Sequence, residues 1–255
     1  MQASDMRGKA VLITGAGSFL GEATALALAK VGADVCLVDT DRDGLEATAS
    51  SARTLGVGAL AIEADIARRQ GCLEAVADAV EAFGRLDGLC NVANAFRPAR
   101  TTTMDPDQWE ASLAINLSAP FFLMQAALPH LIASGDGAIV NVTSPAGDMA
   151  RPYTAAYTAT KAGLTQMTKS IAAEFIGQPV RINMVSFSTS MMSSSSAANL
   201  PADLDPQLFK KAPSTVRPRL ELDEVAQIIA FLASDASRRF HGSCVTIDNG
   251  VSLGC

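Results

Sequence analysis

The sequence of 255 residues has few charges and no basic segment. Lys and Arg number 20 against 26 Asp and Glu, so the net charge is −6, and charged residues make up only 18% of the chain. Proteins that bind nucleic acid cluster Lys and Arg to neutralise phosphates, so nucleic acid is not an expected partner. With 49% apolar residues and a mean hydropathy of +0.22, the chain can bury a large core, which excludes disorder over most of its length.

Paired cysteines are also missing. The chain has five cysteines, an odd number, and they are far apart and never form a CxxC pair. This spacing argues against a disulfide framework and against a zinc site, so we expect free, buried thiols in a reducing compartment and no metal. The five are Cys36, Cys72, Cys90, Cys244 and Cys255.

No targeting or membrane segment is recognised. The beginning of the sequence has only the short apolar run AVLIT before glycines follow, which is too short for a signal peptide. We find no later stretch of the length that a membrane span needs. The sequence therefore predicts a soluble cytoplasmic protein with no membrane partner.

Short apolar runs alternate with segments of helical periodicity along the whole chain. Runs that are continuously apolar are typical of strands covered on both faces, and helical crossovers between them make the sheet parallel. The sequence predicts one α/β domain: a doubly wound parallel sheet of the Rossmann fold in a three-layer α/β/α sandwich. The expected strands are 9–15, 33–39, 58–65, 85–93, 137–144, 180–186 and 243–250, and clear helices are 21–32, 73–83 and 223–234.

A glycine-rich turn follows the first expected strand and opens a helix. In such a turn glycine lets the backbone approach a pyrophosphate, which binds free N–H groups at the positive end of the helix. Glycine after a strand can also serve packing alone, and that reading stays open. The candidate cofactor residues are Gly15, Gly17, Ser18, Phe19, Leu20 and Gly21.

Asp39 ends the second expected strand, 18 residues after Gly21. At about this distance an acidic side chain meets the adenosine ribose hydroxyls in dinucleotide-binding folds, and a carboxylate there repels a 2′-phosphate. NAD is therefore favoured over NADP. The alternative is that Asp39, followed by Thr40 and Asp41, only caps the next helix.

Tyr157 and Lys161 lie four residues apart in a segment of strong helical character, so both project from one face. A fixed ammonium next to a phenol stabilises the phenolate, which would lower a tyrosine pKa from its usual value of about 10. A pair with this spacing is common by chance, and a solvated surface pair is the plain alternative. Ser144 ends an apolar strand 13 residues before Tyr157, where ligands bind in open α/β sheets.

With these elements in order, the whole chain resembles the short-chain dehydrogenase/reductase family. The matching elements are the TGxxxGxG-like start, Asp65 in EADI, Asn116 in INLSAPF, Ser144 and the YxxxK pair at Tyr157. The resemblance implies that Tyr157 is the general acid/base, that Ser144 hydrogen-bonds the substrate oxygen, and that Lys161 binds the nicotinamide ribose and lowers the tyrosine pKa. It further implies that Asn116 holds a water that relays protons. The alternative for Asn116 is a side chain that points to solvent.

Further cofactor contacts follow from the same resemblance. Asp65 and Ile66 would contact the adenine, and Asn91 and Ala93 would line the site from the segment that replaces the family's NNAG motif.

The chain departs from the family pattern in several loops. Phe19 stands where the family has the middle glycine, Asn91–Asn94 replaces NNAG, Phe187–Ser188 replaces Pro-Gly, and Asn249 replaces a glycine near the end. A β-carbon at position 19 would stand where backbone usually approaches the phosphates.

The altered loops surround the expected nicotinamide end of the cleft. The bulk of their side chains is compatible with a mainly apolar, cyclic substrate, although Phe187 and the methionines could equally fill the core or an oligomer contact. The segment 186–220 is expected to be a substrate lid. The candidate substrate residues are Asn94, Pro145, Phe187, Met191 and Met192.

Together these features predict an NAD-dependent oxidoreductase that interconverts a secondary alcohol and a ketone on a small molecule. Two alternatives remain, a 3-oxoacyl thioester reductase and a catalytically silent dinucleotide-binding scaffold. The resemblance also implies a homo-oligomer, a tetramer or a dimer.

Overall fold

The fold is one parallel sheet of seven strands. The computed structural model describes residues 3–187, 204, 205, 207, 208, 220–250 and 252. The strand order is β3-β2-β1-β4-β5-β6-β7. The strands are β1 (Ala10–Thr14), β2 (Asp34–Asp39), β3 (Ala59–Glu63), β4 (Gly88–Asn91), β5 (Gly137–Thr143), β6 (Val180–Phe187) and β7 (Cys244–Ile247).

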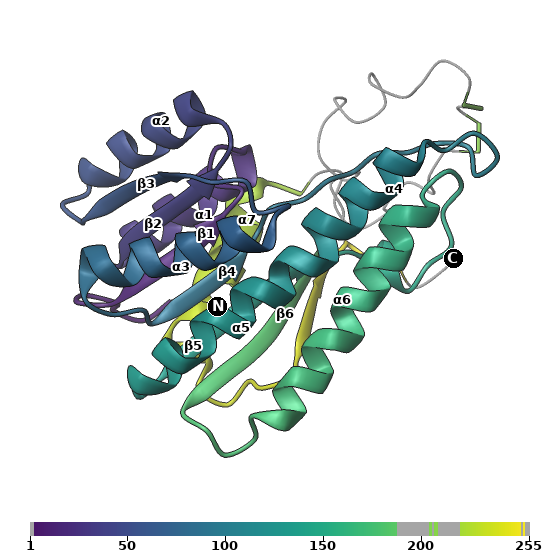
Figure 1. The fold of residues 1–255 in the computed structure, drawn as a ribbon. Coiled ribbons are helices and arrows are strands. Elements are labelled where there is room, and N and C mark those ends of the chain that lie inside the picture. The colour runs from purple at the N-terminus through teal and green to yellow at the C-terminus, as the bar shows by residue number, and fades with distance from the viewer. Residues whose placement is uncertain (1–2, 188–203, 206, 209–219, 251, 253–255) are drawn as a thin grey trace.

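Helices cover both faces of this sheet, as predicted (Figure 1). One apolar cluster joins the sheet to α1, α2 and α7, and a second joins its other face to α3, α5 and α6. The helices are α1 (Phe19–Ala29), α2 (Arg42–Arg53), α3 (Arg69–Phe83), α4 (Pro106–Leu113), α5 (Ala119–Ala133), α6 (Ala155–Glu174) and α7 (Leu222–Ala233). Short turns of other helix types are η1 (Ala114–Ser118), η2 (Pro145–Gly147) and η4 (Asp235–Ser237).

The strand order reverses between β1 and β4. From β1 the chain moves outward to β2 and β3, then returns to place β4 on the other side of β1. The connections that follow β1 and β4 therefore leave in opposite directions, which opens a crevice at the carboxyl ends of the strands. This reversal positions the site described below.

The strands are continuously apolar because the sheet is covered on both sides. All residues of β5 and all residues of β6 are buried.

Asn249, which replaces a glycine of the family pattern, has a φ of 51°. Asparagine tolerates this left-handed conformation better than other non-glycine residues, so the exchange keeps the turn after β7.

The expectation that no stretch is long enough for a membrane span is wrong. Residues 106–133 form a 28-residue helical stretch through α4, η1 and α5 that meets the length and composition of a span. Of its most apolar window, 44% is buried inside the protein, and α5 packs against α3. The burial explains the apolar composition, since a core helix needs the same residues.

The four cysteines that the structure describes are free thiols, but they are not all buried. Cys36, Cys72 and Cys90 are buried as expected, and burial raises the pKa of Cys36 and of Cys90 to about 12. Cys244 is exposed, because it begins the edge strand β7. Cys255 lies outside the described residues, and the part of the chain that is described holds no cluster of possible metal ligands.

Candidate active site

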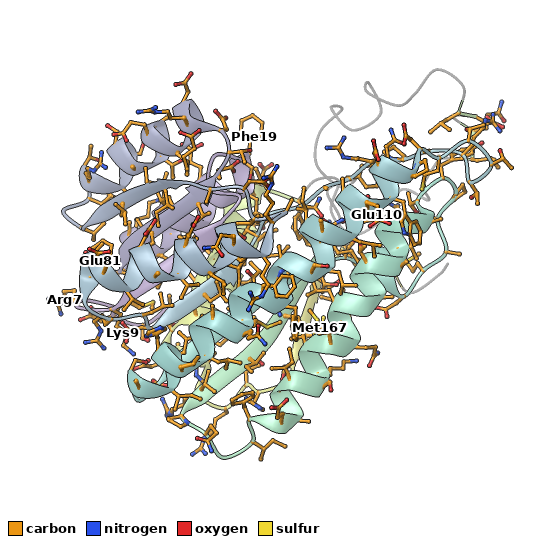
Figure 2. The ribbon with its side chains drawn as sticks, viewed as in Figure 1. Arg7, Lys9, Phe19, Glu81, Glu110 and Met167 are labelled. Carbon is orange, nitrogen blue, oxygen red and sulfur yellow. The ribbon has the colours of Figure 1, made fainter. Side chains whose placement is uncertain are left out.

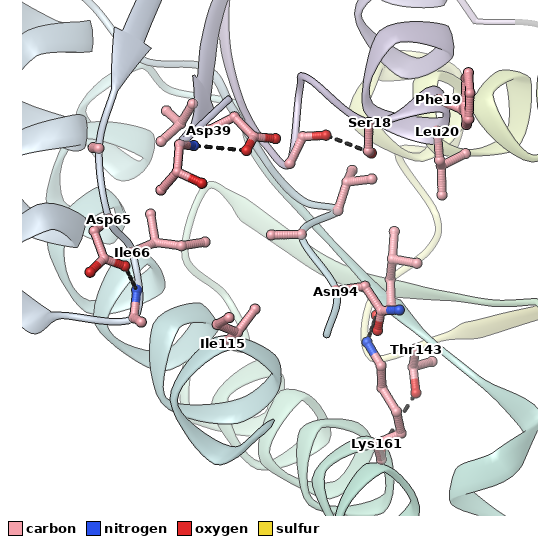
Figure 3. Close-up of a pocket in the computed structure, with 18 of the residues that line it drawn as sticks. Ser18, Phe19, Leu20, Asp39, Asp65, Ile66, Asn94, Ile115, Thr143 and Lys161 are labelled. Carbon is pink, nitrogen blue, oxygen red and sulfur yellow. Dashed lines mark hydrogen bonds between the residues drawn. The ribbon is translucent and has the colours of Figure 1, made fainter. Parts of the chain in front are cut away.

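A cavity of about 510 Å³ opens at the carboxyl ends of the central strands, between the loops that follow β1 and β4 (Figure 3). Its lining joins residues that the sequence analysis selected from six separate segments. Those residues are Gly15, Ser18, Phe19, Leu20, Asp39, Asp65, Ile66, Ala93, Asn94, Tyr157, Lys161 and Phe187. The lining also includes Val38, Thr40, Ala64, Ala67, Val92, Ile115, Val142, Thr143 and Leu222, which were not predicted.

The glycine loop after β1 is held by very close backbone approaches. Gly15 has a φ of +71°, and a Cβ there would lie 2.7 Å from the Cα of Ala93. A Cβ on Gly21 would lie 2.0 Å from the carbonyl oxygen of Gly15. Both positions therefore require glycine, and the loop after β1 is locked against the loop after β4.

Two backbone donors at the start of α1 face the cavity. Ser18 caps the helix, with its Oγ accepting from the Gly21 N–H at 3.2 Å and its carbonyl accepting from Glu22 at 2.8 Å. In the described part of the chain, no hydrogen bond is formed by the N–H groups of Phe19 and Leu20, and both residues line the cavity. Free N–H groups at a helix start suit an anion such as a pyrophosphate.

Phe19 does not block these donors. It is the first residue of α1, it is not among the residues with positive φ, and its side chain is 81% exposed. Figure 2 shows the ring projecting from the edge of the molecule. The phenylalanine thus leaves the helix start intact and places an apolar ring at the mouth of the cavity.

Asp39 lies at the end of β2 and lines the cavity, whereas Asp41 caps α2 by accepting from the Gly44 N–H. The alternative reading of Asp39 as the helix cap is therefore wrong. One carboxylate oxygen of Asp39 accepts from the Gly17 N–H at 3.0 Å, and the other accepts from Thr40 and Asp41. A Cβ on Gly17 would lie 3.3 Å from this carboxylate, a tight contact, so glycine leaves the carboxylate its room here.

Asp65 lies at the same end of the cavity as Asp39 (Figure 3). Its carboxylate accepts from the Ala67 N–H at 3.0 Å and pairs with the exposed Arg68 at 3.3 Å. Ile66 lines the cavity next to it. This end of the site therefore combines two carboxylates with apolar side chains.

Lys161 projects from α6 into the inner end of the cavity (Figure 3). It is 2% exposed, and its Nζ donates to the carbonyl oxygen of Val142 at 3.0 Å. Burial lowers the pKa of this ammonium to about 7. An ammonium has three donors, so this bond leaves hydrogen-bonding capacity toward the cavity.

Tyr157 lies one helical turn before Lys161 on α6, with its ring centroid 5.7 Å from the lysine Nζ. Burial raises the pKa of Tyr157, while hydrogen bonds with Ser144 and Asn94 and the positive charge of Arg151 lower it. Desolvation outweighs these favourable contacts in the unliganded protein. The role of Lys161 in lowering the Tyr157 pKa stays a prediction.

Ser144 and Pro145 lie at the end of β5, beside the tyrosine. The Ser144 hydroxyl accepts from the Ala146 N–H at 3.2 Å, which orients it at the start of η2, and it hydrogen-bonds Tyr157. Pro145 is buried as the first residue of η2 and does not line the cavity.

Asn116 is buried in the π-helical turn η1, which joins α4 to α5. Its side chain exchanges two hydrogen bonds of 2.8 Å with the backbone of Ala95 and donates to the Thr160 hydroxyl at 3.3 Å. The alternative reading of a solvent-facing asparagine is therefore wrong. The side chain ties the loop after β4 to α6, and its role in a proton relay stays a prediction.

Asn91 does not line the cavity. It is buried at the end of β4, where its amide donates to the Asn141 side chain at 2.7 Å, and Asn141 donates to Thr168 at 2.8 Å. This chain of amides joins β4, β5 and α6 below the site.

The remaining expected substrate residues fall in two groups. Phe187 is 7% exposed and belongs both to the cavity wall and to the core cluster. It therefore fills the core and also lines the expected substrate site. Met191, Met192 and Ser188 lie outside the described residues, as does most of the expected lid at 186–220.

Sequence reasoning missed two side chains next to Tyr157. The ring of Phe96 stands perpendicular to that of Tyr157 at a centroid distance of 5.0 Å, and Arg151 acts on the phenol. Both lie in connections without a recognisable motif, and only the folded arrangement brings them together.

Comparison with known proteins agrees with this arrangement. A family model described as enoyl-(acyl carrier protein) reductase matches residues 15–252. The chain belongs to the short-chain dehydrogenase/reductase family.

Three curated relatives illustrate the range of the family around this chain. The 3-oxoacyl-(acyl-carrier-protein) reductase FabG of Thermotoga maritima is 34% identical over 97% of this chain and 99% of its own. The 2,5-dichloro-2,5-cyclohexadiene-1,4-diol dehydrogenase LinX of Sphingobium indicum is 34% identical over 99% of both chains. The cis-4-hydroxycyclohexanecarboxylate dehydrogenase of Sinomonas cyclohexanicum is 33% identical over 95% of this chain and 96% of its own.

Solved structures share the fold over the whole length. A short-chain dehydrogenase/reductase from Burkholderia xenovorans has a TM-score of 0.89 at 31% identity, covering 99% of this chain and 100% of its own. Carveol dehydrogenase from Mycobacterium avium, in complex with NAD, has a TM-score of 0.86 at 26% identity, covering 98% and 99%. A short-chain dehydrogenase from Burkholderia cenocepacia, in complex with NADP, has a TM-score of 0.86 at 30% identity, covering 97% and 99%. This short-chain dehydrogenase/reductase is an oxidoreductase with a nicotinamide dinucleotide cofactor.

Proposed function

We propose that this protein is an NAD-dependent dehydrogenase that interconverts a secondary alcohol and a ketone on a mainly apolar, cyclic small molecule. The observation that carries the proposal is the position of Tyr157. Its phenol is held by Ser144 at the inner end of a long cavity, with Lys161 one turn away.

The residues of the cavity fit a nicotinamide dinucleotide. The free N–H groups of Phe19 and Leu20 would hold the pyrophosphate, Asp39 would accept from the ribose hydroxyls at the adenine end, and Lys161 would bind the second ribose. When bound, the nicotinamide supplies the hydride chemistry, which no protein side chain can perform.

The chain's own groups handle the proton. In the direction of reduction, the Tyr157 hydroxyl gives its proton to the carbonyl oxygen of the substrate, and in oxidation the phenolate takes a proton from the alcohol. Ser144 donates a hydrogen bond to the same substrate oxygen and stabilises the negative charge that develops there. The raised pKa of Tyr157 keeps the proton on the phenol in the unliganded protein.

The choice of NAD rests on the charges that line the cavity. Among the lining residues that the structure describes, Asp39 and Asp65 are acidic and only Lys161, at the opposite end, is basic. A 2′-phosphate next to Asp39 would meet a carboxylate, and no cation is among the described residues that line this end, which favours NAD over NADP.

The choice of an apolar ring rests on Phe96 and Phe187. Phe96 is 40% exposed beside the Tyr157 ring, and Phe187 lines the cavity from the end of β6. The relatives named for cyclohexane and cyclohexadiene alcohols support the same substrate class.

A panel of secondary alcohols with NAD⁺ or NADP⁺ tests the proposal, with NADH absorbance as the readout and Tyr157→Phe as the matched variant. We expect turnover of cyclic alcohols with NAD⁺ and a loss of about a hundredfold or more in the variant, since the ring remains but the transferable proton is gone. Equal turnover by both proteins would overturn the proposed role of Tyr157.

A second candidate is a 3-oxoacyl thioester reductase, favoured by the 34% identity to FabG of Thermotoga maritima. Acetoacetyl-coenzyme A with NADH or NADPH distinguishes the two. Faster reduction of this thioester than of any cyclic ketone would favour the second candidate. A catalytically silent scaffold predicts no turnover in either assay.

A further inference from the structure

Asn94 places an amide side chain at a position where the family pattern has a glycine. The loop after β4 reads Asn91–Asn94 in place of NNAG, so its fourth residue carries a side chain. Asn94 lines the cavity together with Tyr157 and Lys161. Its side chain is exposed, and Figure 3 shows it at the same end of the cavity as Lys161. An amide has two N–H donors and an acceptor oxygen, so the cavity gains a polar group that glycine would not supply.

The backbone on both sides of Asn94 is fixed by hydrogen bonds. The Ala93 N–H donates to the Thr14 hydroxyl at 3.2 Å. Ala95 exchanges two hydrogen bonds of 2.8 Å with the side chain of Asn116, one through its N–H and one through its carbonyl. Asn94 is not among the residues with positive φ, so other side chains can replace it without strain. The amide is therefore presented to the cavity from a backbone that is held in place.

The hydroxyls of a ribose need acceptors as well as donors. Each hydroxyl brings a proton to donate, and the Lys161 ammonium can donate but cannot accept. Thr143 also lines the cavity, but its hydroxyl hydrogen-bonds Thr165 of α6 at 2.9 Å. The proposed reaction uses the Tyr157 hydroxyl for the substrate oxygen. Among the described side chains that line this end, the amide oxygen of Asn94 is the acceptor that is left for a ribose.

We propose that Asn94 binds the second ribose of the dinucleotide together with Lys161, with its amide oxygen accepting from a ribose hydroxyl. This inference rests on the proposed function, which assigns that ribose to Lys161. It adds a side-chain contact that a chain with glycine at this position cannot make. Asn94 therefore strengthens cofactor binding at the nicotinamide end and leaves the adenine end unchanged.

Two ligands separate the ends of the cavity. NADH carries the second ribose, whereas ADP carries only the adenine, the first ribose and the two phosphates. Both are titrated by calorimetry into the wild type, Asn94→Ala, Asn94→Gly, Asn94→Asp and Gln178→Ala. Gln178 is an exposed residue in the connection that leads into β6, at the opposite end of the parallel sheet, so its variant controls for the loss of one amide.

We expect the NADH dissociation constant to rise about threefold to tenfold in Asn94→Ala and in Asn94→Gly, while the ADP dissociation constant changes by less than about twofold. Asn94→Asp keeps an acceptor oxygen and should stay closer to the wild type than Asn94→Ala. Gln178→Ala should match the wild type with both ligands. Thermal unfolding of each variant without ligand checks that the fold is retained.

Three outcomes overturn the inference. An equal loss of NADH and ADP affinity would show that the substitution distorts the loop. Unchanged NADH affinity with a raised KM for the alcohol would show that Asn94 contacts the substrate. Unchanged NADH affinity with an altered pH profile of kcat would show that Asn94 serves Tyr157 alone, to which it hydrogen-bonds in the unliganded protein.

Failure of the proposed function has a different signature. A wild type that binds neither ligand overturns the proposed function and this inference together, whereas NADH binding that is unchanged in Asn94→Ala overturns the inference alone. If the wild type prefers NADPH, the same comparison is made with NADPH, since it carries the same second ribose. Binding needs no turnover, so the result holds even if no alcohol is oxidised.

Discussion

The positive charge of Arg151, six residues before Tyr157 in the chain, lowers the pKa of the Tyr157 phenol, whereas burial raises it. Lys161 is close, with its Nζ 5.7 Å from the ring centroid, but it donates to the carbonyl of Val142 and loses much of its charge to burial. The unliganded site therefore separates two tasks. Arg151 supplies positive charge that acts on the phenol, and Lys161 supplies a hydrogen-bond donor at the inner wall.

This relationship predicts the titration of the phenol. The chain has only two tyrosines, so Tyr153→Phe leaves Tyr157 as the single phenol to follow by ultraviolet absorbance. In this background we expect a pKa above the ordinary value of about 10. Adding Arg151→Met should raise it further, whereas adding Lys161→Met should leave it nearly unchanged. A larger effect of the lysine variant would show that Lys161 controls the phenol.

Lys161 also sets a pH dependence of stability. Its pKa falls from 10.5 to about 7 on burial, so between these values the unfolded chain binds a proton that the folded protein has lost. Relative to the protonated form, the neutral Lys161 side chain therefore stabilises the folded protein. This stabilisation is fully present above pH 10.5 and is lost as the pH falls toward 7. We expect the unfolding free energy of the apo-protein to rise with pH across this window.

Lys161→Met should remove this pH dependence and stabilise the apo-protein at neutral pH by about 1–4 kcal/mol, while activity is lost. Urea unfolding at several pH values measures both effects. A variant that is less stable than the wild type, with the slope retained, would contradict the assignment.

The glycine loop predicts opposite results at two neighbouring positions. Gly21→Ala would place a Cβ 2.0 Å from the carbonyl oxygen of Gly15, so the loop must move, and NADH affinity should fall at least about tenfold. Phe19→Ala removes a ring that is 81% exposed and keeps both free N–H groups. Its NADH affinity should change less than about threefold, with stability within about 0.5 kcal/mol.

Calorimetric titration with NADH compares these two variants. A large gain in affinity for Phe19→Gly or Phe19→Ala, without any turnover, would instead favour the catalytically silent scaffold. Circular dichroism of Gly21→Ala separates loss of the loop from loss of the fold.

Asp39 should control the choice between the two cofactors. Asp39→Asn removes the charge that repels a 2′-phosphate and keeps an oxygen that can accept from Gly17. We expect the ratio of the NADPH dissociation constant to the NADH dissociation constant to fall at least about tenfold. NADPH should bind more tightly because its 2′-phosphate is no longer repelled, and NADH should bind less tightly because its ribose loses an acceptor oxygen. The control is Asp43→Asn, an exposed acidic residue in the first turn of α2. Equal preference in Asp39→Asn and the wild type would reject the role of Asp39.

Local sequence rules were sufficient for the fold and for the position of several residues at the expected cofactor end of the cavity. Apolar runs predicted all seven strands, because a sheet covered on both faces needs continuous apolar residues. Gly15 and Asp39 were placed by spacing, since a strand, a tight turn and a helix start leave little freedom between them.

The substrate end was predictable only in part, because it depends on contacts between distant connections. Arg151 and Phe96 approach Tyr157 from two loops that no local pattern positions. Asn91 has the expected place at a strand end, but its side chain turns to Asn141 and away from the cavity. The burial that lowers the pKa of Lys161 to about 7 was not predictable either, because spacing shows proximity and does not show desolvation.

The central claim, an NAD-dependent site in a working cofactor cavity, is tested most directly by titrating the wild-type protein with NADH and NADPH under the same conditions, using fluorescence and thermal shift. Any ligand that binds the folded state stabilises it, so no knowledge of the substrate is needed. We expect saturable NADH binding at least about tenfold tighter than NADPH binding. Tighter binding of NADPH, or binding of neither cofactor, would contradict it.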